Sequence, residues 1–325
     1  VKMVLDKVRT DGLVPTVEAV RSKLAEPLPM GYSNVGVVIE VGAGIDDVKV
    51  GDRVLSNGRH AEVVGVPRNL CAPVPDGLPD EAAAFGVLGA IGLQGLRLAE
   101  PTLGETFVVT GLGLIGLLTV QLLRANGCRV IGIDPDADRL DLASSFGAQV
   151  VRLDRGVDPV AEVERMTGGL GVDGVLVTAS AQTDEIMHHA ASMCRKRGRI
   201  VLVGVVGLNL RRSDFYEKEL TFRVSCSYGP GRYDPDYEDQ GRDYPLPFVR
   251  WTENRNFEAV LGLLSAGRLD VSALVSARYE IARAEDAYAR LVEDHGVLGV
   301  VLRYPDEEGA PEARTVQHRA PGPPP

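Results

Sequence analysis

The chain has 325 residues, 45% of them hydrophobic, which is enough to fill the core of one large domain or two modest ones. This composition excludes a disordered chain. The formal net charge of −10 disfavours nucleic acid and anionic membrane surfaces as partners, because both favour a basic protein surface. We therefore expect a small molecule as the ligand.

Four cysteines are widely scattered, mostly in apolar runs, and this predicts buried thiols in a reducing compartment. The first twelve residues have no apolar signal-peptide core, and no stretch of about 18 uninterrupted apolar residues is present to span a bilayer. We expect a cytoplasmic protein with no membrane partner. The cysteines are Cys71, Cys128, Cys194 and Cys226.

The N-terminal third alternates between helical and β patterns. In residues 1–30 the string VEAVRSKLAEP has helical spacing and predicts a helical insertion. Residues 35–66 predict a small β region with strands in VGVVIEVG, DVKVGDRV and HAEVVGVP, which Gly, Pro or Asp separate. The alanine-rich string from Asp80 to Ala99 starts with an aspartate and predicts a capped, buried helix.

The middle of the chain contains six short apolar runs, and helix-length stretches separate the first five. Continuous apolar strands that alternate with helices predict an α/β fold with a doubly wound parallel sheet of the Rossmann type. The sixth run alternates more and should form the edge strand. The runs are TFVVT (106–110), RVIGI (129–133), AQVV (148–151), DGVLV (173–177), RIVLV (199–203) and LTFRVSC (220–226).

The C-terminal part predicts two helices, in FEAVLGLLSAG and AEDAYARLVE, and a closing strand in LGVVLRY. Residues 305–325 are rich in proline and charge without periodicity, which predicts a disordered tail or linker. A spacer of this kind suits a junction to a covalently linked second domain after residue 325. An ordinary frayed terminus is the alternative.

A GxGxxG motif lies between the strand 106–110 and the helix that starts near Leu114. The first glycine allows a tight turn, the second lets a pyrophosphate approach the backbone, and the third lets the helix pack on the strand. The helix N-terminus offers free N–H groups to the phosphates. The expected dinucleotide-binding residues of this region are Gly111, Gly113, Leu114, Ile115 and Gly116, with Val205 from a later turn.

The second strand ends in Asp134, 18 residues after Gly116. A carboxylate here can accept both ribose hydroxyls of NAD and repels the additional phosphate of NADP. Arg139 can also reach the ribose edge. We therefore predict NAD as the cofactor. The alternative is a glycine-rich turn in a domain that binds no nucleotide.

The order and spacing of VGVVIEVGAGIDDVKVGDRV, HAEVVGVP, GETFVVTGLGLIGL and IDPDADRLDLASSFGAQVV resemble the medium-chain dehydrogenase/reductase superfamily. The resemblance covers residues 30–304 and looks closest to the dehydrogenase half of bacterial two-domain oxidoreductases, because of residues 215–245. It implies a partial GroES-like catalytic domain (1–90), an NAD-binding Rossmann domain (91–227), and a loop that returns to the catalytic domain (228–304), before the tail or linker (305–325).

The chain departs from the zinc-dependent members of that superfamily. Those members have Gly-His-Glu where this chain has Gly31-Tyr32-Ser33, and their later cysteine or glutamate ligand falls near Val87, which cannot bind zinc. The four-cysteine structural zinc lobe of those members has no counterpart between Val54 and Ala84. We predict no metal site, and we expect His60 to be a packing or hydrogen-bonding residue. We expect no joint metal site from His188 and His189, because adjacent positions on a helix face different ways.

Without zinc, a side chain or water must donate or accept the proton at the reacting carbonyl. Tyr32 is the first candidate and Ser33 a weaker one, although Tyr32 can equally fill the space of the missing metal. A loop after the edge strand adds Tyr228 as a catalytic candidate. Arg232 and Tyr233 of this loop, with Tyr237, Arg242 and Tyr244, suit a sugar or an anionic group. A lid or dimer contact is the alternative for this loop.

These observations predict an NAD(H)-dependent, zinc-independent oxidoreductase that interconverts a hydroxyl and a carbonyl on a polyol, sugar or sugar-linked substrate. One alternative is an NADPH-dependent quinone or enone reductase, against which Asp134 argues. Another is a non-catalytic NAD-binding module of a larger two-domain protein. The apolar edge strand 220–226 predicts a homodimer, because pairing removes an exposed edge.

Overall fold

The computed structural model describes residues 29–153 and 156–305. The chain divides after Ala273 into two compact units. The predicted helical insertion in residues 1–30 and the predicted tail at 305–325 fall almost entirely outside the described residues.

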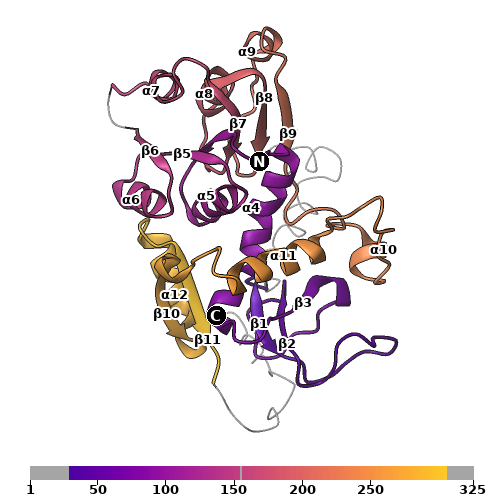
Figure 1. The fold of residues 1–325 in the computed structure, drawn as a ribbon. Helices are drawn as coiled ribbons and strands as arrows, with labels where there is room; N and C mark the ends of the chain where they lie inside the picture. Colours follow the sequence, from indigo (N-terminus) through magenta and orange to yellow (C-terminus); the bar gives the residue numbers. More distant parts are fainter. Residues whose placement is uncertain (1–28, 154–155, 306–325) are drawn as a thin grey trace, which may run out of the picture. The chain divides into compact units, whose positions relative to one another are not determined.

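The first unit contains a six-stranded parallel sheet with the strand order β6-β5-β4-β7-β8-β9 (Figure 1). This order reverses at β4 and β7, as in a doubly wound sheet. The predicted α/β fold is confirmed, and β9 is the edge strand as expected. The strands are β4 (Thr106–Thr110), β5 (Arg129–Asp134), β6 (Gln149–Arg152), β7 (Val172–Val177), β8 (Cys194–Leu202) and β9 (Thr221–Val224).

Helices cover both faces of this sheet (Figure 1). One face packs against α4 (Gly86–Ala99), α5 (Leu114–Ala125) and α6 (Ala137–Ser145), and the other against α7 (Pro159–Met166) and α8 (Glu185–Met193). The short helix α9 (Arg212–Tyr216) precedes β9. Burial on both faces explains why the central strands are apolar without alternation. Val108, Val175 and Ile200 in these strands are completely buried.

A small antiparallel sheet in the order β1-β2-β3 precedes the parallel sheet. Its strands are β1 (Asn34–Val37), β2 (Arg53–Ser56) and β3 (Cys71–Pro73), the last following a 3-10 turn at Arg68–Leu70. The strand predicted in HAEVVGVP is wrong, since residues 60–67 form no strand. A strand in a sheet needs a face to bury, and Cys71 and Ala72 are buried whereas Val63 is exposed.

The predicted helix at 80–99 forms as two segments, α3 (Asp80–Ala83) and α4. Asp80 does not cap it, because Pro79 occupies the N-cap position and the Asp80 carboxylate pairs with Arg53. Four glycines at every third position let α4 approach four neighbours. A Cβ atom at these glycines would lie 2.3 Å from Leu55 at Gly86, 2.6 Å from Val260 at Gly89, 2.7 Å from Thr119 at Gly92 and 2.5 Å from Val203 at Gly95.

The stretch from Asp80 to Ala99 is long and apolar enough to cross a membrane by length and composition alone, and 67% of its apolar window is buried inside the protein. A core helix meets the same criteria. The close contacts of its glycines show that protein neighbours surround α4, so its apolar character serves packing.

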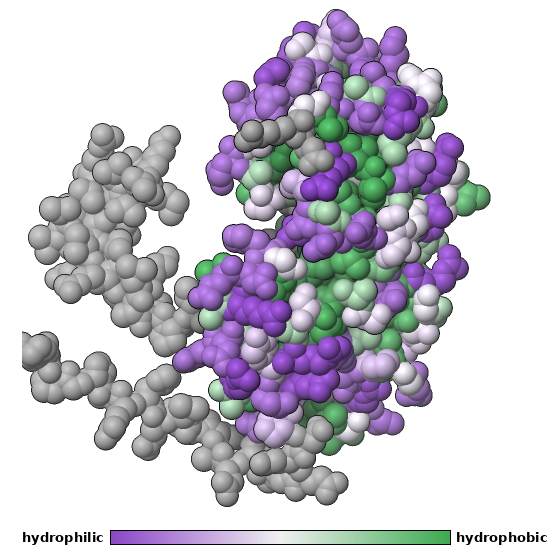
Figure 2. All heavy atoms as spheres, turned by 90° about the vertical axis from the view of Figure 1, so that its left-hand side faces the viewer, coloured by the Kyte–Doolittle hydropathy of each residue, from purple (hydrophilic) through white to green (hydrophobic). Residues whose placement is uncertain are grey.

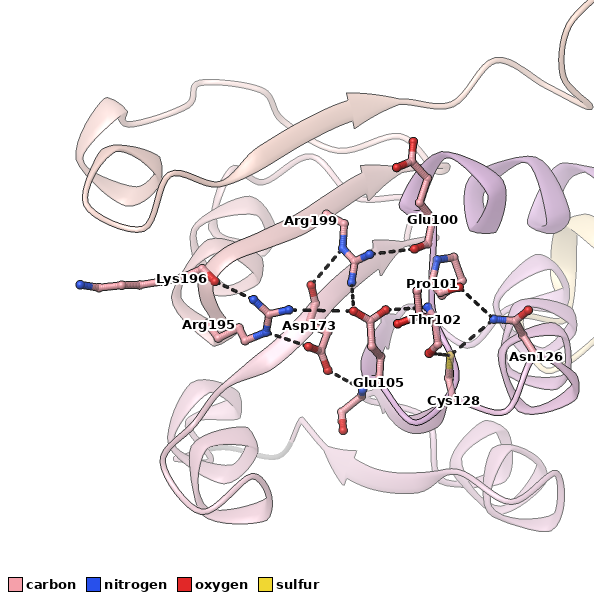
Figure 3. Close-up of polar contacts among 11 residues, drawn as sticks. Glu100, Pro101, Thr102, Glu105, Asn126, Cys128, Asp173, Arg195, Lys196 and Arg199 are labelled. Carbon is pink, nitrogen blue, oxygen red and sulfur yellow. Dashed lines mark hydrogen bonds and ion pairs between the residues drawn. The ribbon is translucent and has the colours of Figure 1, made fainter. Parts of the chain in front are cut away.

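Charged side chains join the amino-terminal ends of β4, β7 and β8 (Figure 3). Arg195 Nε donates to Asp173 at 2.7 Å, Arg199 Nη2 donates to Glu105 at 2.5 Å, and the other Asp173 oxygen accepts from the Thr106 backbone N–H at 2.7 Å. Each charge is paired with an opposite one. This network therefore serves the fold and leaves no group for catalysis.

After β9 the chain forms α10 (Pro235–Glu238) and α11 (Glu253–Ser265), and α11 packs on α4. A 3-10 turn at Ser272–Leu274 spans the boundary between the two units. The second unit contains a parallel pair, β10 (Val275–Glu280) and β11 (Gly299–Arg303), with α12 (Ala284–Glu293) against it and a 3-10 turn at Ile281–Arg283. The two predicted helices and the closing strand are confirmed. The return of residues 228–304 to the catalytic domain stays a prediction.

The surface corrects one expectation about the thiols. Cys71, Cys128 and Cys194 are buried as predicted, but Cys226 is exposed. It follows the edge strand β9, which only β8 covers on one side. Hydrophilic residues cover much of the face in Figure 2, with hydrophobic residues in patches between them, as is usual for a folded protein surface.

Candidate active site

The glycine turn between β4 and α5 has the geometry of a phosphate cradle. Gly111 has φ +91°, and a Cβ atom there would lie 2.5 Å from Ala179 Cα. A Cβ atom at Gly116 would lie 2.0 Å from the Gly111 carbonyl oxygen, whereas nothing lies within 4 Å of one at Gly113. Thus Gly111 and Gly116 are needed for packing, and Gly113 leaves its side of the turn open.

The start of α5 keeps its backbone donors available. Gly113 is the N-cap residue, and no side chain caps the helix. Leu114 and Ile115 in the first turn are half-buried. Val205 follows β8, is 67% exposed, and donates its backbone N–H to the Ala179 carbonyl at 3.0 Å, so Ala179 lies between it and Gly111. The open turn and the uncapped helix fit the pyrophosphate of a dinucleotide.

Asp134 lies at the end of β5 and is only 4% exposed. Its Oδ2 accepts from the backbone N–H of Leu112 at 2.7 Å, and its Oδ1 accepts from that of Asp136 at 2.9 Å. The carboxylate therefore holds the glycine turn against β5. Each oxygen keeps a second lone pair for a ribose hydroxyl. Arg139 is half-buried, with its Nε 3.7 Å from Asp136 Oδ2.

Tyr32 is 49% exposed, and burial of its other half raises the pKa of its hydroxyl. The preceding Gly31 has φ +82°, and a Cβ atom there would lie 2.1 Å from the His60 ring, so His60 packs on this turn. Ser33 Oγ donates to the Ala84 carbonyl at 2.6 Å. This bond gives Ser33 a structural partner, and its catalytic role stays a prediction.

Tyr228 is 5% exposed, and its ring packs on Phe257 of α11 with the centroids 5.3 Å apart. Burial raises the pKa of its hydroxyl, Arg232 and a hydrogen bond with the Asn57 side chain lower it, and Glu253 and Tyr32 raise it. The structure thus brings Tyr32 and Tyr228 into one neighbourhood, although 195 positions separate them in the sequence.

The aromatic loop after β9 is not the open surface that its composition predicts. Tyr237 is 1% exposed and stacks on Tyr244 with the centroids 5.3 Å apart, because the rings bury apolar area in the folded loop. Arg232 Nη1 pairs with Glu238 at 2.5 Å, and its Cζ lies 4.1 Å from the ring of Tyr233, which is 68% exposed. Among these residues, only Tyr233 and Arg242 are exposed.

Glu253, which the sequence analysis missed, is the least expected group at this site. It is the first residue of α11 and is completely buried, and neither carboxylate oxygen has a hydrogen-bond partner among the described residues. Burial, and secondarily Glu238, raise its pKa from 4.5 to about 8, while Arg232 lowers it. A carboxyl with this pKa can hold or release a proton near neutral pH.

Among the described residues, the positions that the superfamily resemblance assigns to zinc ligands hold Tyr32, Ser33 and Val87. Val87 is completely buried in α4. Within residues 29–153 and 156–305, no three His, Cys, Asp or Glu side chains cluster in a way that could hold a metal. His188 pairs with Asp214, its Nδ1 2.8 Å from Oδ2.

Two protein-family models match the chain. The model described as alcohol dehydrogenase GroES-like domain matches residues 4–109, and the model described as zinc-binding dehydrogenase matches residues 115–239. The first match starts at residue 4 and so includes most of the segment in which we expected an insertion. Together the models span the antiparallel sheet and most of the parallel sheet.

Individual relatives cover most of the chain. A D-guloside 3-dehydrogenase of Escherichia coli is 29% identical over 276 residues, which are 82% of this chain and 74% of the relative. A (R,R)-butanediol dehydrogenase of Bacillus subtilis is 25% identical, covering 85% of this chain and 81% of the relative. A solved structure of 2R,3R-butanediol dehydrogenase from Bacillus subtilis has a TM-score of 0.70 at 25% identity, covering 85% and 81% of the two chains.

Proposed function

We propose that this chain, which belongs to the medium-chain dehydrogenase/reductase superfamily of oxidoreductases, is an NAD(H)-dependent enzyme that works without zinc. We propose that it interconverts a hydroxyl and a carbonyl on a polyol, sugar or sugar-linked substrate. The named activities of its relatives on a guloside and on butanediol support this substrate class. The observation that carries the proposal is the uncapped glycine turn in a chain that brings Tyr32, Tyr228 and Glu253 together.

The preference for NAD(H) rests on Asp134. Its carboxylate is fixed beside the glycine turn by the Leu112 N–H, at the position where a 2′-phosphate would meet a negative charge. In the proposed complex the turn and the N-terminus of α5 hold the pyrophosphate, and Asp134 accepts the ribose hydroxyls. The bound nicotinamide supplies or accepts a hydride.

The chain's own residues then handle the proton. In the proposed reaction the Tyr228 hydroxyl hydrogen-bonds the substrate oxygen and passes a proton to it or takes one from it. Asn57 fixes the orientation of that hydroxyl, and Arg232 favours its ionised form. Glu253 stores the proton beneath the loop. Tyr32, which is more exposed, borders the place where substrate enters.

Zinc independence is tested directly by measuring the zinc content of the purified protein. Elemental analysis of the purified protein should find far less than one zinc per chain, and a chelator should leave the turnover of a polyol panel unchanged. A tightly held stoichiometric zinc ion, or activity that a chelator removes and zinc restores, would contradict the proposal.

The catalytic assignment is tested by Tyr228→Phe. The variant should lower kcat about 10²- to 10⁴-fold, the usual loss on removing a general acid–base group, and leave NADH binding unchanged. Tyr216→Phe is the control, since Tyr216 is an exposed phenol on α9, outside the candidate site. Equal turnover in both variants would assign the proton transfer to another group. NADH and NADPH titrations on the wild type test the cofactor preference and separate the enzyme from a quinone reductase that uses NADPH.

A further inference from the structure

The only tryptophan of the chain, Trp251, stacks with two arginines. Arg97 Cζ lies 3.4 Å from the centroid of its ring, and Arg250 Cζ lies 4.0 Å from it. Two planar guanidinium groups this close to one centroid would overlap on the same face, so they lie on opposite faces of the indole. The side chains of α4 and of the segment before α11 meet here.

Arg97 differs from every other half-buried arginine that the structure describes, because no carboxylate pairs with it. Its Nε donates to the neutral Asn256 Oδ1 at 2.7 Å. Arg250 likewise makes no ion pair with a residue that the structure describes. The other half-buried arginines each have an acidic partner, namely Arg53 with Asp80, Arg68 with Asp47, Arg139 with Asp136, Arg195 with Asp173, Arg199 with Glu105, Arg232 with Glu238 and Arg255 with Asp243.

The two positive charges are therefore uncompensated in a protein of net charge −10. Burial, and secondarily repulsion from Arg250, lower the pKa of Arg97 to about 10. Stacking on the indole stabilises each cation modestly, but no carboxylate among the described residues pairs with either guanidinium group. Paired, charge-assisted hydrogen bonds to one oxyanion would satisfy them.

We propose that Arg97, Arg250 and Trp251 form a binding site for an oxyanion, a phosphate or sulfate group. Guanidinium groups recognise such groups through paired N–H donors, and two of them on opposite faces of one ring can share an anion at its edge. The site is connected to the candidate active site, because Asn256 accepts from Arg97 and its Nδ2 donates to the Tyr228 carbonyl at 2.7 Å. It does not depend on the proposed dehydrogenase activity.

Trp251 reports directly on this site, since no other tryptophan contributes to the emission. Inorganic phosphate titrated into the cofactor-free full-length chain, at ionic strength held constant with sodium chloride, should change the tryptophan fluorescence in a saturable way. Arg250→Met should raise the phosphate Kd about 10- to 100-fold, the usual loss when a charged hydrogen bond is removed. Arg250 is exposed, so this variant should fold. Arg97→Met should have the same effect.

Arg165→Met is the matched control, because it removes an exposed arginine of α7 that pairs with Glu162. It should bind phosphate as the wild type does. An equal loss in this control, or no saturable response in the wild type beyond that to chloride, would overturn the proposal. So would a fluorescence change that follows protein dilution and not phosphate, since a carboxylate of a second copy would then be the occupant.

Titrations with glycerol 1-phosphate and with glycerol distinguish a phosphorylated substrate from a free anion as the ligand of this site. Tighter binding of the phosphomonoester than of inorganic phosphate supports a site for a phosphorylated substrate, and tighter binding of inorganic phosphate supports a site for a free anion. Glycerol alone should not bind. The melting temperature is the second readout, and phosphate should raise it more in the wild type than in Arg250→Met.

Discussion

Glu253→Gln should raise the free energy of unfolding relative to that of the wild type, by an amount that grows as the pH rises. The folded-state pKa of the Glu253 carboxyl is raised to about 8, because it is buried without a hydrogen-bond partner and lies near Glu238, whereas the group has a pKa of 4.5 when it is solvated. Between these values the folded chain holds one more proton than the unfolded chain. The free energy of unfolding therefore falls as the pH rises, by about 1.4 kcal/mol per pH unit.

The magnitude follows from the two pKa values. Below pH 4.5 the carboxyl is protonated in both the folded and the unfolded state, so its ionisation does not change the free energy of unfolding. Above pH 8 it is ionised in both states, and the loss of stability stays constant. From pH 5 to pH 8 the loss is about 3 kcal/mol. Glutamine has nearly the same shape and does not ionise, so the variant lacks this slope. Any cost of burying its amide is the same at each pH.

Guanidinium chloride unfolding followed by circular dichroism at pH 5, 6, 7 and 8 measures the effect. The stability of the variant minus that of the wild type should grow by about 3 kcal/mol across this range, with equal m-values. Glu258→Gln is the control, since Glu258 is an exposed residue of the same helix, and it should show no such growth. A difference that stays constant with pH would show that Glu253 is ionised in the folded state and would refute its assignment as a proton store.

Three further changes test other parts of the molecule. Asp134→Asn should weaken NADH binding in a fluorescence titration. The difference in binding free energy between NADH and NADPH should shrink by about 1–3 kcal/mol. Unchanged dissociation constants for both cofactors would show that the cofactor is recognised elsewhere. Gly116→Ala should lower the melting temperature, because its Cβ would meet the Gly111 carbonyl, whereas Gly262→Ala on α11 meets nothing within 4 Å and should not. If β9 pairs with its copy, light scattering should find a dimer that Val224→Lys shifts toward monomer, and a wild-type monomer at working concentration would refute the pairing.

The parallel sheet could be predicted because the residues of each strand form a recognisable apolar pattern in the sequence. A strand buried on both faces is continuously apolar, and the glycines and Asp134 stand at fixed distances from the first strand. The same reasoning failed at residues 60–67, where valines suggested a strand. Whether valines form a strand depends on a neighbour that offers hydrogen bonds and buries one face, and the neighbour of β2 is the segment from Cys71 to Pro73.

The candidate site was less predictable, because it depends on distant contacts. The capping string Thr252-Glu253 is typical of any helix start, where an acidic residue is ordinarily solvated and stabilises the helix. Its burial arises only when the loop 228–233 folds over it. Composition placed Tyr237 with the exposed aromatic residues for the same reason. A count of aromatic and basic residues does not tell which rings the loop buries.

Two ionisable groups without an ion-pair partner among the described residues, one acidic and one basic, flank the segment that contains Tyr228. Among the described residues, the Glu253 carboxylate on α11 has no hydrogen-bond partner, and Arg97 on α4 hydrogen-bonds the neutral Asn256 and no carboxylate. Both destabilise the folded state at neutral pH, and packing alone gives no reason for either. Strongly perturbed ionisable groups concentrate at functional sites because chemistry and binding need them unpaired. A substrate with a hydroxyl at Tyr228 and an oxyanion at Arg97 would use both, which makes phosphorylated polyols the first compounds to assay.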